Sequence, residues 1–382
     1  MPADRWAALA KELAAPGNPP GSAAAVLLDG EVMRTAAAGV LRVGSPAAVG
    51  PDTVFALMSM TKAVTAVAAL ALVEQGAVAL DDPVSRHLPA FGRMRVGGRP
   101  AAEPMLVRHL FTHTSGLLRG NGTHPVEDAY GDVGLRPGQP ADYTLAEFCD
   151  RLATVELAFE PGTAFAYGYS TDVLGRVLEV AAGAPLDEVF DQLVLGPLGL
   201  ADTGFFAADA ARVAILHTRD VPLDDWDVPV ARPAMLSGGA GLLSTVVDYA
   251  RFAAMLSRGG TLDGVRVLSP ESVADMRRNQ LPGGGTIPAL SAIGPEAGTG
   301  DPPGTYTGIG HGLGVAVDEH GAHPGEYGWS GASGSLFFVD PVGGLALVVL
   351  ANRFGPGNAA WRNRLRTLAY RDRPAATPDV AD

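Results

Sequence analysis

Two side chains that could form a nucleophile and its base, Ser59 and Lys62, stand three residues apart before a long apolar run. On a helix, residues three apart lie on one face, with Cβ atoms about 5–6 Å apart. A serine hydroxyl becomes a useful nucleophile when a neighbouring group takes its proton. A lysine accepts that proton only where burial or the positive end of a helix lowers its pKa, and the apolar residues 63–73 favour such burial. The spacing therefore predicts an activated serine at the start of a buried helix.

The basic residues of the chain are strongly biased towards arginine, and Lys62 is an exception. Of 28 lysines and arginines, the lysines are Lys11 and Lys62. Arginine stays protonated at any useful pH and could not serve as a base. The alternative is that Lys62 extends to solvent from a helix end and that Ser59 caps the helix. The four-residue motif by itself leaves both interpretations open.

The elements around this pair follow a pattern of strands at both ends of the chain and helices between them. Two apolar runs joined by Asp29-Gly30 predict a hairpin of residues 23–28 and 32–40. Helices are predicted at residues 3–14, 55–76, 105–111, 144–154, 171–182, 185–194, 245–259 and 359–370. Further strands are predicted at residues 312–318, 326–329, 335–339 and 345–350, and long loops at residues 119–143 and 281–310.

This order of elements predicts an α+β fold with a sheet built from both termini. We expect a discontinuous α/β sheet domain of residues 1–80 and 232–382 and a mainly helical inserted domain of residues 81–231. The active site is expected between the two. The two long predicted loops are candidates for the walls of its substrate pocket.

Composition argues against several classes of binding partner and bears on the cellular location of the protein. A net charge of −13 and a pI near 5.0 argue against nucleic acid or an anionic membrane as partner, because both bind basic patches. The single cysteine, Cys149, excludes an internal disulfide and a cysteine-based zinc site, and its place on a predicted helix favours a core position. The first 21 residues do not resemble a signal peptide, and no apolar run is long enough to span a membrane. We therefore expect a cytoplasmic protein.

Other motifs for catalysis or cofactor binding are incomplete. The chain has no Gly-x-Ser-x-Gly, the nucleophile motif of α/β-hydrolases. His109 and His113 have helical spacing, but Leu110 stands where a zinc metalloprotease motif needs glutamate. The glycine-rich residues 308–314 lack the strand and helix of a dinucleotide-binding loop. We expect no metal and no organic cofactor.

Four long segments, in the same order along the chain, resemble the superfamily of class C β-lactamases and penicillin-binding proteins. Within it they most resemble the family VIII carboxylesterases. The segments are residues 55–91, 107–117, 161–179 and 237–273, and the similarity extends over roughly residues 23–366. The resemblance implies a β-lactamase-like (serine β-lactamase/DD-peptidase) fold, an antiparallel sheet flanked by helices plus a helical domain. Residues 112–116 are a family signature that we expect to form a turn.

The resemblance implies three motifs, of which the first is the pair Ser59 and Lys62. The second holds a catalytic tyrosine in the segment 161–179, where spacing favours Tyr167 over Tyr169. A tyrosine beside an ammonium group is favoured as a phenolate, so Tyr167 and Lys62 could share the base and acid duties. Which of the two is the general base is left open. The alternative for Tyr167 is a core tyrosine whose hydroxyl is hydrogen-bonded.

The third implied motif is Trp329-Ser330-Gly331, where β-lactamases have Lys-Thr-Gly. The family's oxyanion hole is formed by two backbone N–H groups, which would here be those of Ser59 and Ala332. Small residues at this point let the backbone approach the substrate closely. We expect Tyr169, Trp329, Ser330 and Gly331 to contact the substrate.

Two departures from the β-lactamase pattern favour esters. Tyr169 replaces an asparagine that meets the antibiotic's amide, and Trp329 replaces a lysine that helps to bind its carboxylate. Both changes add an aromatic side chain to the wall of the expected substrate pocket, which suits the acyl or alcohol group of a small ester. The sequence thus predicts a serine carboxylesterase that hydrolyses short-chain esters through a Ser59 acyl-enzyme.

Alternatives within the same fold are a β-lactamase, a D-amino-acid amidase or peptidase, and an acyltransferase. A more remote alternative is a non-enzymatic binding protein, which should have lost Ser59, Lys62 or Tyr167. The natural ester, its chirality and the oligomeric state are not determined by the sequence.

Overall fold

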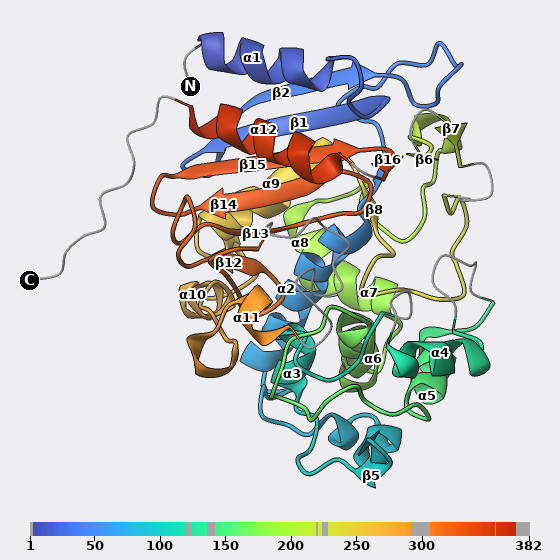
Figure 1. Ribbon diagram of the computed structural model, residues 1–382. Helices are drawn as coiled ribbons and strands as arrows, with labels where there is room; N and C mark the ends of the chain where they lie inside the picture. Colours follow the sequence, from blue (N-terminus) through green and yellow to red (C-terminus); the bar gives the residue numbers. More distant parts are fainter. Residues whose placement is uncertain are drawn as a thin grey trace, which may run out of the picture.

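A seven-stranded antiparallel sheet forms the framework of the computed structural model, which describes residues 3–119, 124–135, 142–218, 221–223, 228–291, 306–355 and 357–371 (Figure 1). The strand order is β11-β12-β13-β14-β15-β1-β2. In chain order these strands are β1 (Gly21–Leu28), β2 (Glu31–Gly39), β11 (Ile309–His311), β12 (Ala316–Asp318), β13 (Tyr327–Ser330), β14 (Leu336–Asp340) and β15 (Leu345–Ala351). Strand β1 pairs with β15, so strands from the two ends of the chain lie side by side within the sheet.

The predicted hairpin of β1 and β2 is confirmed. Asp29 and Gly30 between the strands have φ angles of 50° and 75°, the left-handed conformation that a tight two-residue turn requires at both positions. The Asp29 N–H also donates to the carbonyl of Gly344 (2.8 Å), in the turn between β14 and β15. The hairpin is thereby tied to the C-terminal strands.

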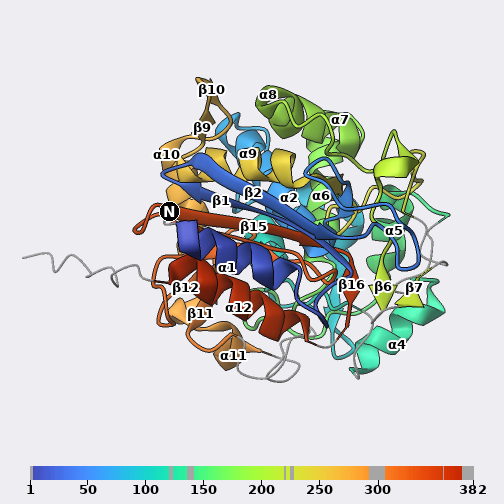
Figure 2. The same ribbon diagram turned by 90° about the horizontal axis from the view of Figure 1, so that it is seen from above.

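Helices cover both faces of the sheet (Figure 2). Helices α1 (Ala3–Leu13) and α12 (Asn358–Tyr370) lie side by side on one face, and α9 (Val246–Ser257) packs against the other. Successive residues of a strand point to opposite faces, so Ala23, Ala25 and Leu27 of β1 join the core on the α9 side, whereas Ala24 and Val26 join the core under α1 and α12. A strand that is buried on both faces needs the continuous apolar sequence that β1 and β15 have.

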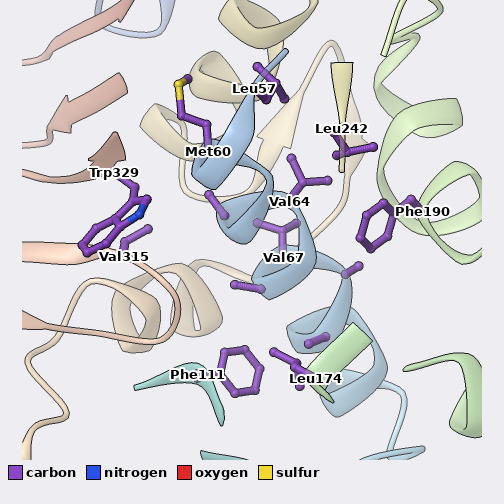
Figure 3. Close-up of a cluster of buried hydrophobic side chains, with 14 of the residues drawn as sticks. Leu57, Met60, Val64, Val67, Phe111, Leu174, Phe190, Leu242, Val315 and Trp329 are labelled. Carbon is purple, nitrogen blue, oxygen red and sulfur yellow. The ribbon is translucent and has the colours of Figure 1, made fainter. Parts of the chain in front are cut away.

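Helix α2 (Thr61–Glu74) runs through the middle of the molecule, and its residues from Thr61 to Leu72 are all buried. A helix that is apolar all round has to be surrounded by protein. Figure 3 shows Val64 and Val67 of α2 among large side chains from distant parts of the chain, including Phe111, Leu174 and Phe190. The apolar run after Lys62 therefore forms a central core helix.

The remaining helices gather mainly around α2, and all of them except α6 are short. They are α3 (Val107–Phe111), α4 (Pro125–Asp132), α5 (Leu145–Leu152), α6 (Ser170–Ala182), α7 (Leu186–Phe190), α8 (Gly196–Leu198), α10 (Pro270–Met276) and α11 (Ile287–Leu290). Single 3-10 turns occur at Met58–Met60, Val84–Arg86, Pro89–Arg93, Ala210–Arg212 and Pro282–Gly284, and a π turn at Asp191–Leu195. Small strands are β3 (Phe55–Ala56), β4 (Arg95–Val96), β5 (Arg99–Pro100), β6 (His217–Thr218), β7 (Val221–Pro222), β8 (Leu243–Ser244), β9 (Thr261–Leu262), β10 (Val265–Arg266) and β16 (Arg353–Phe354).

Some predicted boundaries were wrong for local reasons. The predicted loop 119–143 contains α4, which begins with Pro125 after the capping residue His124, whose ring nitrogen accepts from the Val126 N–H (3.2 Å). The predicted loop 281–310 contains α11 and the start of β11, while residues 292–305 lie outside the described residues. The predicted strand 312–318 begins only at Ala316, because Gly314 turns the chain with a φ of 84°.

The sheet and the helices around α2 share one continuous hydrophobic core. The division into domains at residues 80/81 and 231/232 stays a prediction. None of the helices in the described part of the chain has both the length and the apolar character needed to cross a membrane. The cytoplasmic location also stays a prediction.

Candidate active site

Ser59 lies in a sharp turn between a short strand and helix α2. Strand β3 pairs with β8, and the N–H of Leu57 donates to the carbonyl of Leu242 (2.9 Å). Met58 then has a φ of 50°, a conformation that is uncommon for a residue with a side chain and costs about 1–3 kcal/mol. The chain continues through one 3-10 turn into α2, which leaves Ser59 half-buried at the N-terminal end of this helix.

Two polar side chains, those of Tyr167 and Lys62, meet at the Ser59 hydroxyl. The Tyr167 hydroxyl donates to Ser59 Oγ (2.7 Å), and Lys62 Nζ lies 3.4 Å from the same oxygen. Lys62 Nζ also lies 4.6 Å from the centre of the Tyr167 ring. Tyr167 is separated from Ser59 by 108 positions in sequence, so only the fold could bring them together. Such an arrangement can move the serine proton onto either of two neighbours.

Lys62 is buried, with 6% of its surface exposed, and it is held from a second direction. Its Nζ donates to the backbone carbonyl of Gly239 (2.7 Å), in the segment before β8. A buried ammonium group without such an acceptor would be costly. The carbonyl therefore fixes the position of the lysine head next to Ser59.

The charges near Tyr167 favour its phenolate form. Burial acts to raise the pKa of Tyr167, but the positive charges of Lys62 and Arg119 and hydrogen bonds with Lys62 and Ser59 outweigh it, and the pKa is lowered. A lowered pKa leaves a larger fraction of the tyrosine as phenolate, which is the form that can accept a proton.

A buried histidine holds the segment that carries Tyr167. The carbonyl of His113 accepts from the Ala166 N–H (2.9 Å), and its Nδ1 lies 3.4 Å from the Gly168 nitrogen. The His113 ring centre is 4.7 Å from that of Tyr167. Burial, followed by the charges of His311 and Lys62, keeps the pKa of His113 well below its usual range, so the ring is neutral.

The predicted turn at residues 112–116 is confirmed, with left-handed conformations at His113 and Gly116. Its part in holding Tyr167 was not predicted from the sequence, nor was the place of His311, whose ring lies 5.4 Å from that of Trp329. The presence of His113 inside the family signature was a signal that this turn could have a role. The sequence could not show which residues it contacts, because they are distant along the chain.

The end of β13 lies against the Ser59 turn. A Cβ placed on Gly331 would come within 2.5 Å of the Leu57 carbonyl oxygen and 3.5 Å of the Met58 Cβ. Glycine is thus required for this approach. Ala332, the next residue, is half-buried, and the indole of Trp329 lies 5.5 Å from the Tyr167 ring. The structure therefore brings the third predicted motif next to the first two.

Comparison with known proteins identifies the family. Residues 6–371 match the family model described as Beta-lactamase. The chain belongs to the beta-lactamase family. It is 37% identical over 326 residues to Protein Rv1367c of Mycobacterium tuberculosis (strain ATCC 25618 / H37Rv), a match that covers 78% of this chain and 77% of the relative. It is 33% identical over 365 residues to Esterase EstB of Burkholderia gladioli, covering 87% of this chain and 86% of the relative.

A solved structure of the same fold agrees with this result. The structure of "EstCE1, a hydrolase with promiscuous acyltransferase activity" has a TM-score of 0.80 and 29% identity, and the match covers 96% of this chain and 98% of that chain. The predicted β-lactamase-like fold and the resemblance to family VIII carboxylesterases are confirmed. At the level of the family, the protein is a serine hydrolase with esterase relatives.

Three other residues considered from the sequence make packing or backbone contacts in this beta-lactamase family member. Tyr169 precedes α6 and is half-buried, and its ring packs edge-on against Tyr130 (5.7 Å) and Phe148 (5.0 Å). Cys149 is buried on α5, where burial raises the pKa of its thiol. His109 Nδ1 accepts from the Leu106 N–H (3.2 Å) at the start of α3. Among the described residues, no group of three or more histidine, cysteine or acidic side chains is arranged to hold a metal ion.

Proposed function

We propose that the protein is a serine carboxylesterase that hydrolyses short-chain carboxylic esters through an acyl-enzyme on Ser59. The observation that carries the proposal is the pair of contacts at Ser59 Oγ, with the Tyr167 hydroxyl at 2.7 Å and Lys62 Nζ at 3.4 Å. A serine beside two groups able to exchange protons meets the main requirement of nucleophilic catalysis. The esterase relatives of the chain support the ester as substrate.

In the acylation step, Ser59 Oγ attacks the ester carbonyl carbon and its proton passes to the Tyr167–Lys62 pair. Tyr167 is the closer group and has a lowered pKa, which favours it as the immediate acceptor, with Lys62 stabilising the phenolate. The tetrahedral intermediate then collapses, and the alcohol leaves with the proton from the pair. In the second step, water attacks the acyl carbonyl carbon and gives a proton to the Tyr167–Lys62 pair. The bond to Ser59 Oγ then breaks, Oγ takes that proton back, and the acid is released.

The developing oxyanion would be bound by the backbone N–H groups of Ser59 and Ala332. Support comes from the close packing of Gly331 on the Leu57 carbonyl, which brings the residue after it to the Ser59 turn. Backbone donors fixed in this way are worth about 2.7–4 kcal/mol each in related chemistry.

The aromatic wall beside the nucleophile supports an ester over a β-lactam. Trp329 is buried, contacts Tyr167 and stacks on Tyr306 (6.1 Å), where a β-lactamase would place a cationic lysine. We propose that Trp329, Ser330, Gly331 and Tyr169 contact the acyl or alcohol group. Transfer of the acyl group to another alcohol is a second candidate activity, because the EstCE1 structure is described as a hydrolase with promiscuous acyltransferase activity.

The test compares wild type with Ser59→Ala on a graded series of aryl esters and one chromogenic cephalosporin. We expect ester turnover with a preference for short acyl chains, its loss in Ser59→Ala, and an unchanged melting temperature. Ester turnover that survives the substitution would contradict the mechanism. Faster turnover of the cephalosporin than of every ester would contradict the esterase assignment.

A further inference from the structure

A buried carboxylate lies behind Lys62, and the mechanism above gives it no role. Asp172 is in the first turn of α6, five residues after Tyr167, and is 6% exposed. Its Oδ1 accepts hydrogen bonds from Ser237 Oγ (2.5 Å) and from the Gly239 N–H (3.1 Å). Burying a carboxylate is costly unless several donors satisfy it. A leucine or alanine would fill a helix face at lower cost, so the position calls for an explanation.

One of the two hydrogen-bond donors to Asp172, Gly239, is also the residue whose carbonyl holds Lys62. Gly239 receives the carboxylate on its N–H and offers its carbonyl to Lys62 Nζ (2.7 Å). The residues around it are fixed as well, since the Gly238 carbonyl accepts from Thr65 Oγ1 (2.6 Å). A chain of contacts thus runs from Asp172 through one backbone residue to the ammonium beside Ser59.

The segment at Gly239 is shaped to fit the carboxylate. A Cβ on Gly239 would lie 2.6 Å from Asp172 Oδ2, and one on Gly238 would lie 2.8 Å from the Thr171 carbonyl oxygen. Neither glycine has a left-handed φ, so close approach to α6 explains these glycines better than backbone conformation does. The short distance between α6 and this segment keeps the Gly239 carbonyl in line with Lys62.

The Lys62 ammonium is the main charge that favours the ionised form of Asp172. Burial raises the pKa of Asp172, and the Lys62 ammonium, followed by the Ser237 and Gly239 hydrogen bonds, opposes that rise. The other titratable groups that face it are neutral near pH 7, because burial raises the pKa of each: Cys149 on α5, Tyr143 and Tyr169. Asp172 and Lys62 therefore act on each other across Gly239.

We propose that Asp172 is a positioning residue for the reaction at Ser59: through Gly239 it fixes the Lys62 ammonium, and its negative charge stabilises that ammonium. The inference rests on the proposed function. Asp172 does not touch the aromatic wall at Trp329, so its loss should affect kcat more than KM. Displacing a proton-transfer group by about 1 Å can cost on the order of 100-fold in rate.

The test measures ester hydrolysis by Asp172→Ala, Asp172→Asn and Ser237→Ala over a range of pH, with Ala240→Ser as control. Ala240 is exposed on the same segment, so its substitution should change nothing. We expect kcat of Asp172→Ala to fall about 10- to 100-fold with KM changed less than threefold. Asparagine keeps the acceptor oxygen, so Asp172→Asn should recover most of kcat.

The pH profile separates positioning by charge from a merely structural contact. Without the carboxylate, the positive charge of Lys62 is no longer offset and favours the Tyr167 phenolate more strongly, so the acidic limb of kcat/KM should move to lower pH in Asp172→Asn. Ser237→Ala keeps the charge, so it should lower kcat mildly without that movement.

The outcomes distinguish this inference from the proposed function. Full kcat in folded Asp172→Ala, or an unmoved limb in Asp172→Asn, would overturn the role of Asp172 while Ser59→Ala still abolished turnover. If Asp172→Ala does not fold, Asp172→Asn and Ser237→Ala decide the question. Turnover that survives Ser59→Ala would instead overturn the proposed function.

Discussion

At the scale of single residues, Tyr167 and Lys62 both contact the same oxygen atom, Ser59 Oγ. The tyrosine is nearer, and the lysine lies against the tyrosine ring as well as the serine. Because the Lys62 ammonium lies so close to Tyr167, its charge favours the phenolate form of the tyrosine. Substitutions at this point test what each of these contacts contributes.

Lys62→Arg keeps a cation beside Tyr167, but the larger planar guanidinium cannot take the place of the Nζ that contacts Ser59 Oγ and the Gly239 carbonyl. We expect kcat for an aryl ester to fall by about 10²- to 10⁴-fold, the usual worth of a positioned acid or base. The matched control is Lys11→Arg at the other lysine of the chain, exposed on α1, which should behave as wild type. More than a tenth of wild-type kcat in Lys62→Arg would show that a cation near Tyr167 suffices and that the exact position of Lys62 Nζ does not matter.

Arg119→Gln tests how the phenolate of Tyr167 is stabilised. Burial opposes a lowered pKa at Tyr167, and Lys62 and Arg119 overcome it, so loss of one cation should raise the pKa of Tyr167. The acidic limb of kcat/KM should therefore move to higher pH, opposite in sign to the movement expected for Asp172→Asn. Arg119→Lys retains the charge and serves as the control. An unmoved limb in Arg119→Gln, measured over pH 5–10, would mean that Tyr167 does not carry the observed titration.

At the scale of elements, three separate segments position the site: the turn before α2, the end of β13 and the turn at His113. Each approaches another backbone too closely for a larger residue. Gly331 packs on the Leu57 carbonyl, and Gly168 packs on the carbonyl of Leu117, 2.3 Å from where its Cβ would lie. The site therefore depends on close backbone contacts between segments as well as on the catalytic side chains that they carry.

Gly331→Ala should disturb the contact between β13 and the Ser59 turn. The added Cβ would meet the Leu57 carbonyl oxygen at 2.5 Å, and overpacking of this kind costs about 1–3 kcal/mol of unfolding free energy. We expect lower stability in urea together with a lower kcat, because the Ala332 N–H is displaced.

Gly131→Ala on α4 is the control for that substitution. A Cβ at Gly131 has no atom within 4 Å, and alanine favours a helix by up to about 1 kcal/mol. Wild-type kcat and stability in Gly331→Ala would show that the backbone yields easily and that this contact does not position Ala332.

At the scale of the whole molecule, a buried ionic cluster ties the edge of the sheet to the last helix. Arg366 of α12 bonds both Asp318 (3.2 Å) and Glu326 (2.9 Å), and the Tyr370 hydroxyl donates to Glu326 (2.7 Å). Glu326 stands just before β13. The C-terminal helix is thereby joined to the strand that leads to Trp329.

Glu326 should make the stability of the protein depend on pH. Burial raises the pKa of Glu326 to about 7 in the folded protein, against 4.5 ordinarily, although Arg366 opposes the rise. The folded state then binds more protons than the unfolded state between these values, so stability falls as pH rises from about 4.5 to about 7. Glu326→Gln keeps the hydrogen-bond acceptor and should remove this slope, worth at most about 3 kcal/mol.

The measurement is the free energy of unfolding in urea at several values between pH 5 and 8. Wild type should be less stable relative to Glu326→Gln at pH 8 than at pH 5. A constant difference between the two proteins across this range would show that Glu326 does not titrate there.

The sequence by itself determined the features that depend on local pattern. The hairpin at Asp29-Gly30, the apolar helix after Lys62 and the pairing of Ser59 with Lys62 on one helix turn follow from residue spacing and turn chemistry. The choice of Tyr167 over Tyr169 rested on family spacing, and the structure brings Tyr167 to Ser59 while Tyr169 packs on Tyr130. The catalytic roles of these residues stay proposals.

Only the tertiary structure decided which distant residues meet at the site. Gly239 lies 177 positions from the lysine it holds, and Asp172 lies 67 from Gly239. His113 supports Tyr167 through a backbone carbonyl, an interaction that its residue type does not reveal. Helix and strand periodicity report contacts within a few residues, whereas these contacts depend on how α2, α6 and the segment before β8 pack together. The physical reason is that a backbone atom has the same chemistry at every position, so only its place in the fold gives it a role.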